Sequence, residues 1–239
     1  MIEKPKVEVC FTPNMFPLYA EDFEVVVVID VLRATSAICT AFHYGVKKIV
    51  PVSTLNQAID YKDKGYYVAA ERKGKIVSGF EFGNSPLAYT NDKLKDQTLV
   101  FTTTNGTKAI NMAKNIEHLL IGSFLNLDAI NNYLIELNKS VLILGSGWEN
   151  KFCLEDSICA GAISEKLLKT NKFESNNDST IAAKYLFVSA KSNYFGYLKA
   201  SSHRKRLKKL NLNEDIKYCL TPNQTDVIPV REDYYLKKL

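Results

Sequence analysis

The chain has 239 residues, of which 46% are hydrophobic and 24% charged, and its formal net charge is +5. This length suits one sizeable α/β core and is short for two independent enzyme domains, so we expect a single domain over residues 1–239. No apolar run approaches the roughly 20 residues that a membrane span needs, and the N-terminus has neither a signal core nor transit character. We therefore expect a cytoplasmic protein.

The pattern of short β-branched runs and longer helical periods predicts alternating strands and helices. The expected strands are Lys6–Phe11, Glu24–Asp30, Lys48–Val52, Tyr66–Ala70, Thr98–Thr102, His118–Gly122 and Val141–Leu144. The expected helices are Ala34–Tyr44, Thr54–Lys64, Thr107–Lys114, Leu127–Leu137, Leu154–Lys169 and Thr180–Val188. Ser53 or Thr54, Asn126 and Ser179 are the expected caps of the second, fourth and sixth helices. Continuous Val/Ile/Leu strands, each followed by a helix, indicate a largely parallel sheet covered on both faces.

The five cysteines are scattered along the chain, and none forms a C-x-x-C pair. They are Cys10, Cys39, Cys153, Cys159 and Cys219. Without a secretion signal, buried reduced thiols are expected in preference to disulfides, and a catalytic cysteine is the minority alternative.

Polar side chains follow the expected strand 24–30, at the strand end where parallel sheets bind ligands. Asp30 ends the strand, Arg33 lies in the short loop, and Thr35 and Ser36 stand at the mouth of the next helix. A helix N-terminus presents free N–H groups and a positive dipole end, which favour phosphate, and hydroxyls and a guanidinium add hydrogen bonds. The alternative is a plain Thr35 cap with Arg33 paired to a surface acid.

A second hydroxyl-rich loop follows the expected strand 98–102 and holds Asn105, Gly106 and Thr107. The segments DVLRATSAICTA and TTTNGTKAINMA align without gaps and share Thr, Ala, Ile and Ala. This similarity suggests two seats for anions, as a substrate with two anionic groups would require. The alternative is a tight Asn-Gly turn followed by a Thr cap.

Two carboxylates, Glu155 and Asp156, fall in the first turn of the helix that follows the strand 141–144. Acids at this position complement the helix dipole, which is the structural interpretation. Adjacent carboxylates near a strand end are also plausible ligands for Mg²⁺, which prefers oxygen donors and keeps water and phosphate in its shell.

A further segment joins Glu71 and Arg72, just after a strand, to a Gly-Asn-Ser-Pro loop that contains Asn84 and Ser85. Its length without clear secondary structure suits a lid or a substrate-binding loop better than a simple surface turn.

A basic run extends from Lys191 to Leu210 and contains no acid. Within it, His203, Arg204 and Arg206 could contact anionic oxygens, and the whole run could form a cationic wall over a polyanion. For most of its lysines we prefer a solvated helix face. Binding of nucleic acid is disfavoured because no recognised motif accompanies the charges.

Together these segments resemble the 2-phosphosulfolactate phosphatase family, the ComB-like phosphatases of coenzyme M biosynthesis. The resemblance rests on DVLRATSA (30–37), ERKGKIVSGFEFGNSP (71–86), TTTNGTKA (102–109), EDSICAG (155–161) and the SSHRKRL and DIKYC stretches. It implies an α/β/α three-layer fold with a largely parallel or mixed sheet, dependence on Mg²⁺, and hydrolysis of the phosphate ester of sulfolactate. The expected S-x-H-G-x-R-L pattern differs here, because Arg204 and Lys205 follow His203 without a glycine. Other phosphorylated 2-hydroxy acids are alternative substrates.

The resulting hypothesis is a Mg²⁺-dependent phosphatase for a small, multiply anionic organic acid. The expected catalytic residues are Asp30, Arg33, Glu71 and Glu155, and the expected metal ligands are Asp30, Glu155 and Asp156. The expected substrate-binding residues are Thr35, Ser36, Arg72, Asn84, Ser85, Asn105, Gly106, Thr107, His203, Arg204 and Arg206. Attack by Asp30 itself and attack by metal-bound water are both open.

The competing class is a non-catalytic protein that senses a phosphorylated organic acid. Carboxylates beside a polyanion argue against it, unless a metal or a proton offsets their charge. We expect neither a nucleic-acid nor a membrane partner. For the oligomeric state we expect a homodimer, because two-fold homodimers are the commonest assembly.

Overall fold

The computed structural model describes residues 3–239. The strands are β1 (Val7–Cys10), β2 (Val25–Ile29), β3 (Lys48–Pro51), β4 (Tyr67–Arg72), β5 (Lys75–Ile76), β6 (Thr98–Thr102), β7 (His118–Gly122), β8 (Val141–Gly145), β9 (Pro229–Glu232) and β10 (Tyr235–Lys238). The α-helices are α1 (Ala34–His43), α2 (Leu55–Asp63), α3 (Gly106–Met112), α4 (Leu127–Leu137), α5 (Leu154–Lys169), α6 (Asp178–Ala190), α7 (Tyr194–Tyr197), α8 (Ser202–Lys209) and α9 (Asn213–Cys219). Every strand and helix expected from the sequence is present, with small shifts of its ends.

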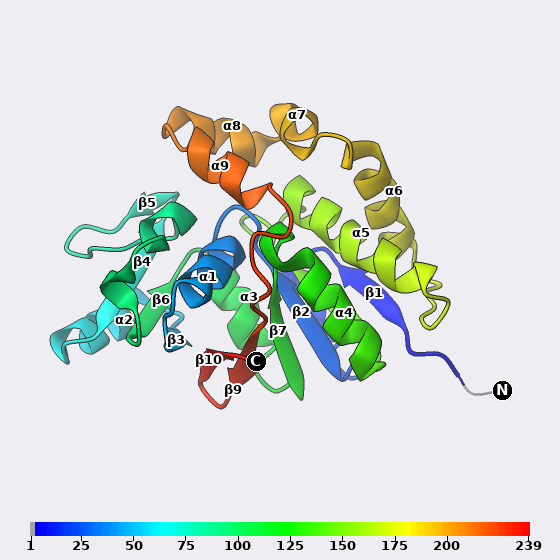
Figure 1. Cartoon of the computed structure of the whole chain (residues 1–239), viewed down its shortest axis with the longest axis horizontal. Coiled ribbons are helices and arrows are strands. Elements are labelled where there is room, and N and C mark those ends of the chain that lie inside the picture. The colour runs from blue at the N-terminus through cyan, green and yellow to red at the C-terminus, as the bar shows by residue number, and fades with distance from the viewer. Residues whose placement is uncertain (1–2) are drawn as a thin grey trace.

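The structure has three layers, a central sheet between two layers of helices (Figure 1). The sheet is mixed, because it contains both parallel and antiparallel strand pairs. Strands β1, β8, β2 and β7 pair in parallel, and β3, β6 and β4 form a second parallel group. The hairpin of β9 and β10 lies between the groups and pairs antiparallel with β7 on one side and with β3 on the other. The pairing therefore reverses the chain direction between the groups, which the sequence pattern did not predict.

Helices cover both faces of the sheet because the side chains of a strand alternate between its two faces. In β2, Val26 and Val28 pack in one core with residues of α1 and α3. Val25, Val27 and Ile29 pack in the other core with residues of α4 and α5. The α/β/α architecture expected from the sequence is thus confirmed. All five cysteines are buried and free, also as expected.

The caps were only partly predicted. Thr54 caps α2 as expected and forms a capping box with Gln57. The expected cap Asn126 stands before α4, but its side chain instead donates to the carbonyls of Ile121 and Val227. Helix α6 begins earlier than predicted and is capped by Asn177, which accepts from the backbone N–H of the expected cap, Ser179.

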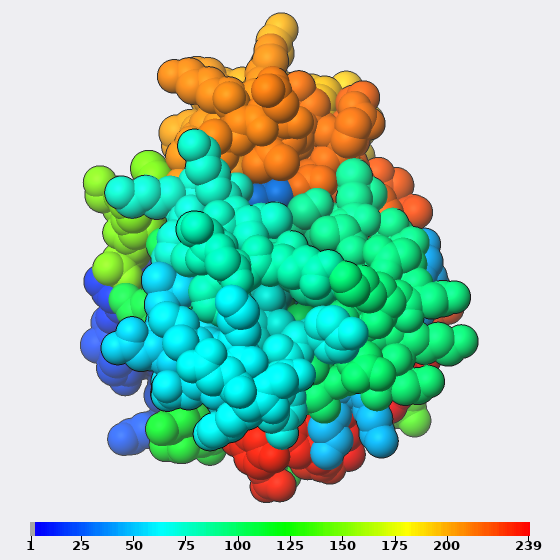
Figure 2. Space-filling view, turned by 90° about the vertical axis from the view of Figure 1, so that its left-hand side faces the viewer, coloured from blue at the N-terminus to red at the C-terminus, as the bar shows by residue number. Residues whose placement is uncertain are grey.

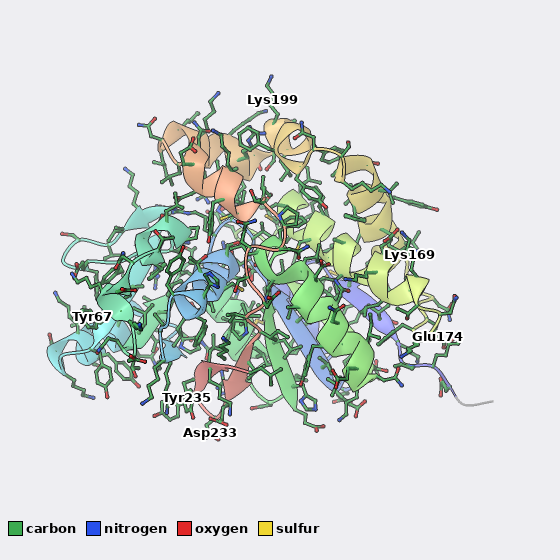
Figure 3. All side chains as sticks on the ribbon, viewed as in Figure 1. Tyr67, Lys169, Glu174, Lys199, Asp233 and Tyr235 are labelled. Carbon is green, nitrogen blue, oxygen red and sulfur yellow. The ribbon has the colours of Figure 1, made fainter. Side chains whose placement is uncertain are left out.

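Helices α7, α8 and α9 form a C-terminal cover over one end of the sheet. Helices α7, α8 and α9 lie above α1 and the top of β2, whereas the β9–β10 hairpin, with Asp233 in its turn, lies at the opposite end of the molecule (Figures 1 and 3). Lys199, between α7 and α8, is exposed and projects away from the body (Figure 3), as the solvated-face interpretation of the basic run expects. Within residues 3–239, no helix combines the length and apolarity required to cross a membrane.

Candidate active site

A polar cavity that is open to solvent lies under α8. Figure 2 shows a recess at this place, between the orange C-terminal helices and the blue-green β4–β5 region. Its lining comes from β4, from the loops after β2, β4, β5, β6 and β8, and from α8: Asp30, Leu32, Arg33, Glu71, Gly74, Asn84, Thr104, Asn105, Trp148, His203, Arg206 and Leu207. Seven of the residues singled out in the sequence are in this set, namely Asp30, Arg33, Glu71, Asn84, Asn105, His203 and Arg206.

The carboxyl ends of the two parallel groups meet at this cavity despite their opposite directions. A Cβ atom built on Gly106, at the start of α3, would lie 2.6 Å from Cβ of Ala34 and 2.9 Å from Oδ2 of Asp30. The first residues of α1 and α3 occupy equivalent places in the ungapped alignment of the two segments. Only a residue without a Cβ allows this close approach of the two helix starts, so Gly106 determines how near the second loop comes to Asp30.

Asp30 is a buried carboxylate at the bottom of the cavity. Its Oδ1 accepts a hydrogen bond of 3.4 Å from the N–H of Ala34, and its Oδ2 faces Gly106. Burial raises the pKa of Asp30 to about 6, although His203 acts in the opposite direction. A carboxylate with an oxygen free of hydrogen bonds within residues 3–239 is suited to hold a cation or to act as a nucleophile.

Glu71 and Asn84 form the wall on the β4 side. Glu71 accepts hydrogen bonds from the N–H groups of Gly74 and Thr104, the latter at 3.4 Å, and its Oε2 lies 3.5 Å from Nδ2 of Asn84. The amide oxygen of Asn84 is buried and has no hydrogen-bond partner within the described part of the chain. Gly74 adopts φ +84°, a conformation that favours glycine, and so closes the β4–β5 turn around Glu71.

His203 is oriented by Glu155. Nδ1 of His203 lies 2.5 Å from Oε1 of Glu155, and Sγ of Cys153 is 2.9 Å from the same oxygen. Burial alone would raise the pKa of Glu155, but the hydrogen bond and charge of His203 outweigh burial and lower it. Since His203 lines the cavity and its Nδ1 faces Glu155, Nε2 is the nitrogen available to a ligand.

Asp156 joins two loops of the site instead of lining the cavity. Its Oδ1 accepts from the N–H of Val31 at 2.9 Å, and its Oδ2 accepts from the N–H of Gly147 at 3.2 Å. Burial and the nearby charges of Asp30 and Glu155 raise its pKa well above the usual range. Both oxygens are therefore committed to positioning the β2–α1 and β8–α5 loops.

Arg33 is held by an acid that the sequence analysis did not single out. Its Nη1 forms a buried ion pair with Asp215 of α9, and its Nη2 donates to the carbonyl of Gly74 at 3.0 Å. The hydroxyl of Ser85 donates to the other oxygen of Asp215 at 2.9 Å. Asp215 thus connects the C-terminal cover to two loops of the cavity. The sequence did contain a signal for this acid, because Asp215 begins the DIKYC stretch, one of the stretches that carry the family resemblance.

Three hydroxyls expected to bind phosphate are turned toward the backbone. Thr35 accepts from the N–H of Asp30 at 3.0 Å, and Ser36 donates to the carbonyl of Val31 at 2.9 Å. Thr107 donates to the carbonyl of Thr103 at 3.1 Å. They are buried outside the cavity lining and stabilise the loops, as Ser and Thr often do by bonding to nearby backbone groups.

Two arginines that were expected to bind the substrate, Arg72 and Arg204, instead donate hydrogen bonds to other groups of the chain. Arg72 donates to the carbonyl of Glu71 at 2.6 Å and to the hydroxyl of Thr102 at 3.0 Å. Arg204 donates to the carbonyl of Phe195 and lies 3.7 Å over the ring of that residue. Neither lines the cavity.

The oxygen donors that face the cavity suit a hard divalent cation. The same space is lined by the carboxylates of Asp30 and Glu71 and by the amide side chain of Asn84. The buried amide oxygen of Asn84 has no hydrogen-bond partner within residues 3–239. Mg²⁺ binds such oxygens and leaves positions for water and a substrate phosphate. Glu155 and Asp156, also expected as ligands, do not line this cavity.

Comparison with known proteins shows the family of this chain. The profile of the 2-phosphosulpholactate phosphatase family matches residues 10–234. A probable 2-phosphosulfolactate phosphatase of Caldanaerobacter subterraneus subsp. tengcongensis is 40% identical, with 85% of this chain and 86% of the relative covered. Proteins of the same name from Clostridium novyi and Thermotoga maritima are 40% and 39% identical, covering 85% and 90% of this chain and 87% and 92% of their own. The chain therefore belongs to the 2-phosphosulpholactate phosphatase family.

Proposed function

We propose that this protein is a Mg²⁺-dependent phosphatase. Its substrate would be 2-phospho-3-sulfolactate or a related phosphorylated 2-hydroxy acid, and its products the hydroxy acid and inorganic phosphate. The observation that carries the proposal is one cavity containing both the buried carboxylate of Asp30 and the imidazole of His203, which is oriented by Glu155. Membership of the family supplies the substrate class.

His203 is the proposed general acid. Hydrolysis breaks the bond between phosphorus and the ester oxygen, and the leaving oxygen takes up a proton as the bond breaks. Glu155 stabilises the protonated imidazole through Nδ1, so that Nε2 can carry the proton into the cavity and deliver it to that oxygen. A water molecule supplies the new oxygen on phosphorus and, overall, the proton that restores His203.

Asp30 is the group proposed to act at phosphorus, whereas His203 acts at the leaving oxygen. It can attack phosphorus directly and form an acyl phosphate, or it can orient the attacking water. Rapid-quench analysis with labelled substrate separates these routes, because only direct attack yields a trapped phosphoenzyme and a burst. Asp30→Asn abolishes turnover on either route, and near-normal activity of this variant would remove Asp30 from the mechanism.

Charge balance is the reason to include Mg²⁺. Asp30 and Glu71 line the cavity with two carboxylates, which would repel a substrate that carries several negative groups. Asp30, Glu71 and the Asn84 amide oxygen would hold the cation. When bound, Mg²⁺ would offset the charge of these carboxylates and of the phosphate in the transition state.

The test is phosphate release from 2-phospho-3-sulfolactate by the metal-free protein, with and without added Mg²⁺. We expect turnover only with Mg²⁺ and its loss on addition of a chelator. Turnover that a chelator does not affect would contradict metal dependence. Binding of the ester without phosphate release, at any Mg²⁺ concentration, would favour the non-catalytic sensor.

A further inference from the structure

Helix α8 presents two polar side chains to the cavity from one face. His203 and Arg206 are three positions apart and both line it, as expected for side chains one turn apart on a helix. His203 is bound to Glu155, but Arg206 has no acidic partner within residues 3–239, and its Nε is buried without a hydrogen bond. A guanidinium in this state is suited to bind an anion from outside the chain.

The other predicted arginines of the site differ from Arg206 in this respect. Arg33 is neutralised by Asp215, and Arg72 and Arg204 donate to backbone carbonyls and do not border the cavity. Asp30 and Glu71 share the cavity with Arg206, but neither forms an ion pair with it. Of the arginines singled out in the sequence, Arg206 is therefore the one that faces the cavity with unshared charge.

Trp148 fixes the position of this guanidinium. Cζ of Arg206 lies 4.7 Å from the centre of the Trp148 ring, and the imidazole of His203 stacks on the same tryptophan at 6.4 Å with an interplanar angle of 18°. A cation over an aromatic ring is held by the ring quadrupole and keeps its N–H groups available at the edge. Trp148 itself is held by a tight turn, in which it exchanges two backbone hydrogen bonds of 3.0 and 2.9 Å with Lys151.

We propose that Arg206, supported by Trp148, binds a second anionic group of the substrate, a sulfonate or a carboxylate beside the phosphate ester. This places the second anion seat on α8, and not in the 102–107 loop where the sequence pattern suggested it. The inference rests on the proposed function for the identity of the substrate. It makes Arg206 a specificity-determining residue and Trp148 a positioning residue.

Binding can be measured without turnover, because Trp148 is the one tryptophan of the chain. Its fluorescence, excited selectively over tyrosine, reports directly on the site. The full chain with Mg²⁺ is titrated with sulfolactate, lactate and inorganic phosphate. In Arg206→Gln we expect the Kd for sulfolactate to rise about 10- to 100-fold, the factor for losing a hydrogen bond to a charged group. The Kd for inorganic phosphate should change by less than about threefold.

Lys205→Gln is the matched control, because it removes the same charge from an exposed neighbour on α8 that does not line the cavity. It should bind like the wild type. Trp148→Leu, titrated by calorimetry, should weaken sulfolactate as Arg206→Gln does, whereas Trp148→Phe should retain most of the affinity. In Arg206→Gln, weaker binding of sulfolactate with unchanged binding of lactate identifies the sulfonate as the bound group. An equal loss of affinity for lactate identifies the carboxylate.

The inference is overturned if Arg206→Gln binds sulfolactate like the wild type, or if its affinity for inorganic phosphate falls by the same factor. In the second case Arg206 serves the phosphoryl group. The proposed function fails separately. A wild-type protein with Arg206-dependent sulfolactate binding but no phosphate release would retain the anion seat and lose the phosphatase assignment.

Discussion

Oε1 of Glu155 and Nδ1 of His203 lie 2.5 Å apart, although the two residues are separated by 48 positions in the chain. Glu155 opens α5 under the sheet edge, and His203 belongs to the helical cover above it. This contact directs the carboxylate of Glu155 to the imidazole and away from the cavity. It also ties the C-terminal cover to the part of the site that the strands build.

We expect Glu155→Gln to lower kcat by about 100-fold or more and to leave KM within about threefold. The amide cannot stabilise a protonated imidazole as the carboxylate does, whereas groups that contact the substrate are unchanged. Steady-state phosphate release measures both constants. The double variant Glu155→Gln/His203→Gln should be little slower than His203→Gln, because the two residues act as a unit.

Glu149→Gln is the control for this pair, since Glu149 is exposed in the turn after Trp148 and does not line the cavity. It should retain wild-type kcat. A Glu155→Gln variant with wild-type kcat would show that His203 does not depend on Glu155.

The pKa of Asp30 predicts how stability depends on pH. Burial raises this pKa from 3.8 to about 6, so the folded state binds the proton more tightly than the unfolded state. The stabilisation is therefore complete below about pH 4 and is lost as the pH rises through about 6. Asp30→Asn has no such loss. The free energy of unfolding of this variant minus that of the wild type should therefore rise between pH 4 and pH 7, by up to about 3 kcal/mol.

Urea unfolding of the metal-free proteins at pH 4, 5, 6 and 7 measures this difference. Asp60→Asn, on the exposed face of α2, should follow the wild type at every pH. A difference between Asp30→Asn and the wild type that stays constant with pH would contradict the raised pKa.

Asp215→Ala should destabilise the protein by about 3–5 kcal/mol, because it leaves the buried guanidinium of Arg33 without its charged partner. It should also lower kcat/KM, since Asp215 connects α9 to Arg33 and to Ser85. Thermal unfolding and phosphate release measure the two effects. Replacing both members of the pair, in Arg33→Met/Asp215→Leu, should cost less stability than the two single changes together.

Glu214→Ala is the control for Asp215. Its side chain is exposed and forms an ion pair of 2.8 Å with Lys217, so we expect a change within about 0.5 kcal/mol. Equal effects of the two substitutions would mean that the contact between α9 and Arg33 contributes nothing specific.

Gly106→Ala should cost about 1–3 kcal/mol of stability, the usual range for overpacking, and lower kcat. The added methyl would lie 2.6 Å from Cβ of Ala34 and 2.9 Å from Oδ2 of Asp30, so the second loop must move away from the carboxylate. Adding Ala34→Gly removes the first contact and should restore part of the stability. Unchanged melting temperature and kcat in Gly106→Ala would contradict the close approach of the two loops.

Local pattern was enough to place the elements and the polar loops of the first two-thirds of the chain. The strand before Asp30 is a run of β-branched residues buried on both faces, and the predicted range, Glu24–Asp30, exceeds it by one residue at each end. The polar loops after β2 and β6 were expected at the ends of strands where parallel sheets bind ligands. The reversal of the second group of strands by the β9–β10 hairpin was not expected.

The roles of single side chains were predicted less well. Thr35, Ser36 and Thr107 occur where a phosphate-binding loop would have hydroxyls, but the same residue types also satisfy backbone groups of a tight turn. A sequence motif does not distinguish these uses. The structure does, because each hydroxyl has a backbone partner.

By itself, the sequence determined most of the strands and helices up to α6, that the thiols are buried, and that Asp30 and Asn105 follow buried strands at positions suited to a site. Periodicity records which face of an element is buried, and this information is local. Only the tertiary structure decided that Glu155 binds His203 and that Arg33 binds Asp215, 182 positions away. It also placed Arg206 over Trp148 without an acidic partner within residues 3–239. Such pairings depend on how the short, polar helices α8 and α9 pack onto the sheet edge, which no repeating pattern in their own residues specifies.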